Sequence, residues 1–133
     1  MARRAAAVAA PLGTMAAVLG AFGYVGAVDP GEPGHYPVCP LLHLTGLYCP
    51  GCGGLRSAHA VAHGDLAAAL GANALAVTAY AAFAALWTVW LLRALRGRPV
   101  GFRVRASQGW PLVAVVVLFT VVRNSPLGTG LVP

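Results

Sequence analysis

The apolar residues of this chain fall into three long runs, which are separated by two polar segments. Residues 5–28 form the first run, with Pro11 in its early part. Residues 65–93 form the second run, in which Asn73, Thr78 and Thr88 are the polar exceptions between Leu66 and Leu92. Because about 20 apolar residues cross a bilayer as a helix, the pattern predicts transmembrane helices over 5–28 and 65–93.

The third apolar run, from Trp110 to Val122, is shorter than the other two. On its length alone it also fits a re-entrant segment. Extended over residues 107–124, with Trp110 at the inner interface, it becomes long enough to cross. We therefore predict a third membrane span over 107–124, and an all-α integral membrane protein with about three transmembrane helices in one domain, 1–133.

The polar segment over residues 35–64, between the first two runs, is predicted to hold a cysteine-rich loop and a short helix. Residues 39–65 carry all three cysteines and three of the four histidines. Residues 53–63 are compatible with a short helix that Gly64 ends, since glycine readily adopts the left-handed conformation after a helix. Asp65 is then well placed as the N-cap of the following helix.

Composition and charge placement support a membrane protein. Hydrophobic residues make up 59% of the chain and charged residues 9%, whereas a soluble domain carries about 25% charged residues. The nine cationic residues lie at the edges of apolar runs rather than on one polar face, which argues against nucleic-acid binding. A basic loop is predicted over residues 94–106, and Arg3 and Arg4 precede the first run.

The basic segments predict the orientation, because cationic loops stay cytoplasmic. The N-terminus and the 94–106 loop are then cytoplasmic, and the cysteine-rich loop is extracytoplasmic, in the cell membrane. A cleaved signal peptide is the alternative for the first run, but its apolar core is usually about 7–15 residues. The run here is longer, which favours a retained helix. The bilayer is the expected partner, with self-association or another membrane protein as further candidates.

Three cysteines suggest a zinc site. Cys49 and Cys52 have the spacing of half a zinc knuckle, since two intervening residues let both thiolates reach one tetrahedral ion. Cys39 is a candidate third ligand, and His43, His59 or His63 a candidate fourth. The last two histidines are four residues apart and share one helix face.

Two other roles of the cysteines stay open. The Cys-Pro-Gly-Cys sequence from Cys49 to Cys52 is a plausible dithiol, and a thiol at a helix N-terminus has a lowered pKa. An extracytoplasmic position also favours a structural disulfide, between Cys49 and Cys52 or involving Cys39. No βαβ pattern surrounds the motif, which argues against a thioredoxin-like enzyme.

A second group of polar residues maps to the same end of the predicted helices. Such residues are costly in a membrane, so they usually pair or serve function. An ion pair of Asp65 with Arg123 or with Arg56 would tie helices together, and the functional alternative is a small polar pocket beside the cysteines. The group consists of Arg56, Asp65, Asn73, Arg123 and Asn124.

These residues together resemble a family of small bacterial membrane proteins, the domain of unknown function 2752 family. The family pattern is Cys-Pro-x-Cys-Gly-x-Thr-Arg, a later His-Gly-Asp, an Asn-Pro in the next span and an Arg-Asn near the end. The matching positions are Cys39-Pro40, 44–47, 49–53, Arg56, 63–65, Asn73 and Arg123-Asn124. Leu55 stands where the family has Thr, and Ala74 where it has Pro. The resemblance implies the architecture and the site, but no substrate.

Two classes of function follow. The first is a non-enzymatic membrane protein whose cysteine loop, bound to zinc or linked by a disulfide, braces the helices and binds a partner. The second is a thiol–disulfide redox enzyme or a metal-dependent enzyme that uses Cys49 and Cys52. The first is favoured, because the sequence shows no independent general base and no cofactor motif.

Overall fold

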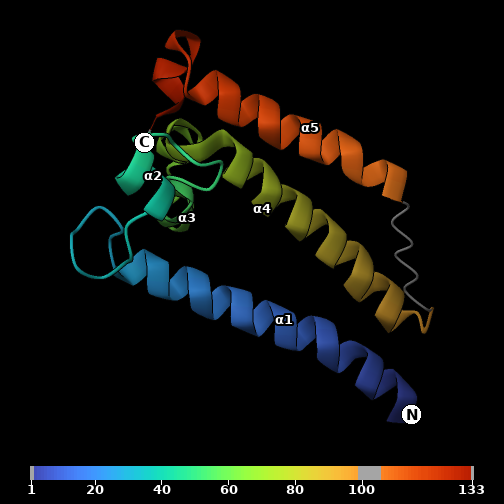
Figure 1. Cartoon of the computed structure of the whole chain (residues 1–133). Helices are drawn as coiled ribbons and strands as arrows, with labels where there is room; N and C mark the ends of the chain where they lie inside the picture. The colour runs from blue at the N-terminus through green and yellow to red at the C-terminus, as the bar shows by residue number, and fades with distance from the viewer. Residues whose placement is uncertain (1, 99–105, 133) are drawn as a thin grey trace.

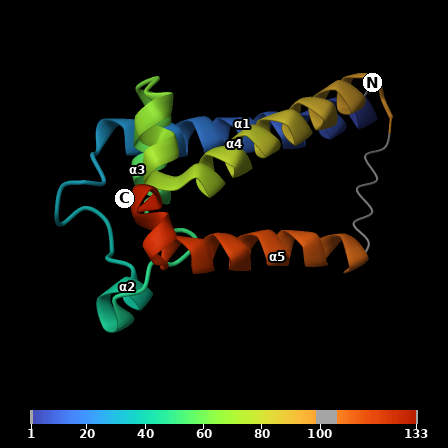
Figure 2. The ribbon, with the colours of Figure 1, turned by 90° about the horizontal axis from the view of Figure 1, so that it is seen from above.

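Two long helices run side by side in opposite directions and form the body of the molecule (Figures 1 and 2). In the computed structural model, which describes residues 2–98 and 106–132, these are α1 (Ala2–Ala27) and α4 (Leu66–Leu95). Both are long and apolar enough to cross a membrane, over Ala6–Ala27 and Leu66–Leu95. The prediction of an all-helical fold is confirmed, and the described residues contain no strand.

The third long helix, α5 (Ala106–Arg123), has a shorter apolar part over Gly109–Arg123. It ends beside the start of α4, where the 3-10 helix η1 (Pro126–Leu131) packs on both α4 and α5. Along the rest of its length α5 stands apart from α1 in the view from above (Figure 2). Of the predicted basic loop over 94–106, residues 99–105 lie outside the described residues.

Two short helices lie at one end of the long ones. They are α2 (Pro40–Thr45) and α3 (Gly54–Ala62), and the sequence predicted only the second. Gly64 follows α3 with a φ of 77°, and the Asp65 side chain accepts a hydrogen bond from the Ala68 N–H at 2.9 Å. The predicted stop and the predicted N-cap are therefore both present. The N-terminus and the far end of α4 lie at the opposite end of the molecule (Figure 1).

The helix α4 is broken near its start, which the sequence did not predict. Asn73 has a φ of −164° and a ψ of 94°, which is extended backbone inside an otherwise helical segment. Figure 2 shows the first turns of α4 at a steep angle to the remainder. The straight part after the break has about 22 residues, which at 1.5 Å per residue is about 33 Å long and matches the apolar thickness of a bilayer.

The long helices expose most of their apolar side chains. Within the two candidate spans only 6% and 0% of the most apolar window is buried. Leu19 on α1 is 63% exposed and Leu118 on α5 is 64% exposed. A core helix of a soluble protein of this length would bury such a stripe, so burial in a soluble core does not account for the composition of these helices.

Candidate functional site

The three cysteines converge at the end of the molecule that carries α2 and α3. Their Sγ atoms all lie within 4.8 Å of one another. The distance from Cys49 Sγ to Cys52 Sγ is 2.9 Å, and that from Cys39 Sγ to Cys49 Sγ is 3.5 Å. Two sulfurs bound to one tetrahedral zinc ion at about 2.3 Å are about 3.8 Å apart. The group is therefore of the size that one metal ion needs, after a small expansion.

Local structure explains why Cys39 joins the other two cysteines across ten residues. Cys39 is the N-cap of α2 and has extended backbone, and Pro40 follows it at the first helical position, where a missing N–H costs nothing. Gly46 ends α2 with a φ of 72°, so the chain reverses and returns as residues 47–52. This short helical turn brings Cys39 against Cys49.

The three thiols are not equivalent. Hydrogen bonding by the Leu42 backbone N–H, and then by the Cys52 and Cys49 side chains, lowers the pKa of Cys39 to about 7. Burial, and then hydrogen bonding to Cys49 and Cys39, raises the pKa of Cys52 to about 12. Without a metal, the half-buried Cys39 thus ionises far more readily than the buried Cys52, which stays protonated at neutral pH.

Asn73 connects α4 to the cysteine loop, and this explains the break in the helix. Its Oδ1 accepts a hydrogen bond from the Ala76 N–H at 2.9 Å, which is the N-cap arrangement for the part of α4 that begins after it. Its Nδ2 donates to the carbonyls of Pro50 at 2.9 Å and Cys52 at 3.0 Å. Asn73 is 1% exposed, and its bond to the Cys52 carbonyl is buried.

Arg123 and Asn124, at the end of α5, hold the same loop from the other side. The guanidinium of Arg123 is 1% exposed and donates to the carbonyls of Ala72 at 3.0 Å and Cys49 at 3.4 Å. Asn124 accepts from the Tyr48 N–H and donates to the Tyr48 carbonyl, both at 2.8 Å. The backbone of residues 48–52 is therefore fixed by side chains from α4 and α5.

The predicted ion pairs of Asp65 with Arg123 and with Arg56 are not formed among the described residues. Asp65 caps α4, and Arg123 has carbonyl oxygens and two aromatic rings as its neighbours, those of Tyr48 at 5.6 Å and Phe119 at 5.5 Å. Its Nε atom is buried and has no hydrogen-bond partner. The helices are tied by bonds from side chains to backbone instead. The buried guanidinium of Arg123 needs hydrogen-bond acceptors, and the carbonyls of Cys49 and Ala72 supply them.

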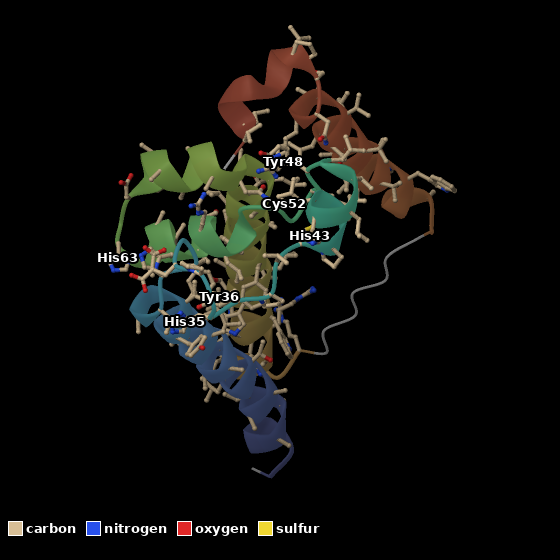
Figure 3. The ribbon with its side chains drawn as sticks, turned by 60° about the vertical axis from the view of Figure 1, so that its left-hand side comes forward. His35, Tyr36, His43, Tyr48, Cys52 and His63 are labelled. Atoms are coloured by element: carbon tan, nitrogen blue, oxygen red, sulfur yellow. The ribbon has the colours of Figure 1, made fainter. Side chains whose placement is uncertain are left out.

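The histidines offered as ligands lie outside the group of three sulfurs. The Nδ1 of His59 lies 2.8 Å from the Val25 carbonyl, which ties α3 to the end of α1, and the Nδ1 of His63 lies 2.9 Å from the His59 carbonyl. Figure 3 shows His63 at the end of α3 that is farther from Cys52. His43 lies on α2, nearer to Cys52 than His63 in Figure 3.

A cavity of about 740 Å³ adjoins the cysteines. All three cysteines line it, together with His43 on α2, Arg56 on α3 and the loop over residues 30–34. The three sulfurs are donors that could hold one metal ion, and the cavity beside them is large enough for a small ligand.

Tyr80 and Trp87 are positioning residues that the sequence analysis missed. Tyr80 donates its hydroxyl to the Gly54 carbonyl at 2.9 Å, and Trp87 donates its indole N–H to the Pro11 carbonyl at 2.8 Å. Together with Asn73 they are spaced seven residues apart, which places them on one face of a helix. The seven-residue spacing of these side chains with polar ends in an apolar run could have predicted that they share one face of the helix.

Comparison with known proteins bears on the segment that carries the site. Searches of curated proteins and of solved structures found no match. Arg123 and Asn124 lie outside residues 39–87, the segment that a family model matches. Their place in the site therefore depends on their hydrogen bonds to the Cys49 and Tyr48 carbonyls. Residues 39–87, which include all three cysteines and Asn73, match the model of the family described as "Protein of unknown function (DUF2752)", and the resemblance to that family is thereby confirmed.

Proposed function

We propose that this chain is a small multi-pass membrane protein in which a three-cysteine zinc site braces the ends of the membrane helices. The membrane part is supported by the exposure of the apolar helices. It is also supported by the threonines of the long helices. Thr14, Thr78 and Thr88 each donate to the carbonyl four residues earlier, which is how a hydroxyl is satisfied in a helix that faces lipid.

The proposed orientation places the zinc site outside the cytoplasm. The start of α1 and the segment around Arg96 and Arg98 lie at one end of the molecule and the cysteines at the other (Figure 1). Cationic segments remain on the cytoplasmic side. A retained α1 is favoured over a cleaved leader, because α1 is bonded to the rest of the chain through Trp87 at one level and through His59 at another.

The convergence of three Sγ atoms within 4.8 Å carries the proposal of a zinc site. Zinc binds thiolates at about 2.3 Å, and the three cysteines would supply three of its four ligands. The loop that holds two of the cysteines is bonded to α4 and α5. A metal that joins Cys39 to this loop would therefore fix the connection after α1 against both of the other long helices. The lipid bilayer is the partner of the apolar helices in this proposal, and self-association or binding of another membrane protein stays a prediction.

Metal analysis of the purified full chain in detergent tests the proposal. The expected result is one zinc per chain, with all three thiols protected from a thiol reagent until a chelator is added. Cys52→Ala should lose the metal. His63→Ala is the matched control, because this exposed side chain lies outside the sulfur group, and it should retain zinc. A metal-free protein with three reactive thiols would exclude the zinc site.

The second candidate function is thiol–disulfide exchange, and a specific observation supports it. A thiol whose pKa is lowered to about 7 (Cys39) lies next to a buried thiol whose pKa is raised to about 12 (Cys52). Such a pair combines a nucleophile at neutral pH with a protected partner. Redox titration with glutathione distinguishes the two functions. A chain that is purified without zinc and forms a disulfide reversibly in this titration would favour exchange.

A further inference from the structure

The proposed zinc site has three donors from the described residues, and zinc in proteins is almost always bound by four. His59 is engaged with the end of α1, and His63 lies toward the far end of α3. His43 lies on the wall of the cavity, outside the group of sulfurs. The cavity of about 740 Å³ is therefore the direction from which a fourth donor reaches the metal.

The charges around the site indicate what kind of donor this is. A divalent metal with three thiolates carries a net charge of about −1. The buried guanidinium of Arg123, which bonds to the Cys49 carbonyl and has no carboxylate partner among the described residues, offsets that charge. Arg56 is exposed and lines the cavity, as does Glu32. The Arg56 guanidinium is a cationic group of this lining and can meet the charge of an anion bound at the metal.

We propose that the fourth coordination position of the metal opens into this cavity and binds a small monoanion, whose charge is met by Arg56. The proposal rests on the zinc site proposed above. Three protein ligands with an open fourth position are the arrangement of zinc sites that bind exchangeable ligands, whereas structural sites are closed by a fourth residue. In this proposal the cavity binds the ligand, and His43 does not coordinate the metal.

Cobalt substitution of the purified full chain tests this proposal, because the visible bands of Co²⁺ report its ligands. Azide is the anionic probe and imidazole is the neutral probe. Both should shift the visible bands in a saturable way, in the wild type and in His43→Ala. Arg56→Gln should weaken azide binding by about two- to fivefold, the range expected for an exposed ion pair, and leave imidazole binding unchanged. Arg98→Gln, at the other end of the molecule, is the matched control and should change neither.

The failures can be told apart. Absence of a thiolate-to-cobalt absorption band overturns the metal site itself, and the open position with it. A normal thiolate band that neither probe alters overturns only the open position. The same holds if His43→Ala by itself changes the spectrum, since His43 would then be the fourth ligand. Equal azide affinity in Arg56→Gln and the wild type overturns the assignment of the anion to Arg56.

Discussion

Asn73 is the residue whose replacement tests the connection between the membrane helices and the site most sharply. In Asn73→Ala the helix after the break loses its cap, which costs about 1 kcal/mol. The carbonyls of Pro50 and Cys52 lose their donors, and a buried carbonyl without a partner costs about 1–3 kcal/mol. With two such carbonyls the sum is roughly 3–7 kcal/mol, a large part of the 5–15 kcal/mol that is typical of a folded domain.

Asn73→Asp separates the two roles of the side chain. The carboxylate can still accept from the Ala76 N–H, so the cap is retained. It cannot donate to the two loop carbonyls, and it places negative charge against them. We therefore expect Asn73→Asp to release the cysteine loop while α4 stays capped.

The assay is the rate at which an alkylating reagent labels Cys52 in the metal-free protein, together with the unfolding midpoint in detergent. Both variants at position 73 should expose Cys52, and its labelling should be at least tenfold faster. Thr78→Ala is the control, because that hydroxyl bonds only within its own helix. Labelling of Cys52 in Asn73→Ala at the rate seen in Thr78→Ala would contradict this role of Asn73, as would continued protection of Cys52 in Asn73→Asp.

Three further predictions concern reactivity and backbone fit. In the metal-free protein at pH 7, Cys39 (pKa about 7) is about half thiolate, and Cys52 (pKa about 12) is almost entirely protonated. Iodoacetamide should therefore label Cys39 before Cys52. Peptide mass spectrometry that finds Cys52 labelled first would contradict this. Ala74→Pro places proline at the first helical position after a cap, and should raise the unfolding free energy by about 0.4–1 kcal/mol; a lower thermal midpoint would show that the helix does not begin there. Gly128→Ala would put a Cβ 2.7 Å from the Arg123 Cα, whereas the Cβ of Gly130→Ala meets nothing within 4 Å. Gly128→Ala should lower the unfolding free energy by about 1–3 kcal/mol, and Gly130→Ala should change it little. Equal effects of the two variants in thermal unfolding would contradict this packing of η1.

The length and polarity of the apolar runs were sufficient to predict the long helices. Asp65 and Gly64 were also readable, because capping and helix termination depend on neighbouring residues. The break at Asn73 was not readable. One asparagine in a long apolar run is compatible with a continuous helix, and the break depends on carbonyls more than twenty residues away in the sequence.

The hydrogen bonds of the site were not predicted. An ion pair of Arg123 with Asp65 was one of the alternatives considered, because polar residues in a membrane usually pair or serve function. The partners of Arg123 are backbone carbonyls and aromatic rings, which carry no signal in the sequence. The approach of Cys39 to Cys49 depends on the six-residue helix α2, which is too short to show an apolar period.

X-ray absorption at the zinc edge of the purified full chain is the sharpest test of the three-cysteine zinc site, because it reports the atoms bound to the metal and their distances. We expect three sulfur atoms at about 2.3 Å and one nitrogen or oxygen atom at about 2.0–2.2 Å. A spectrum with fewer than three sulfurs, or a chain that retains no zinc while its three thiols remain reactive, would contradict it.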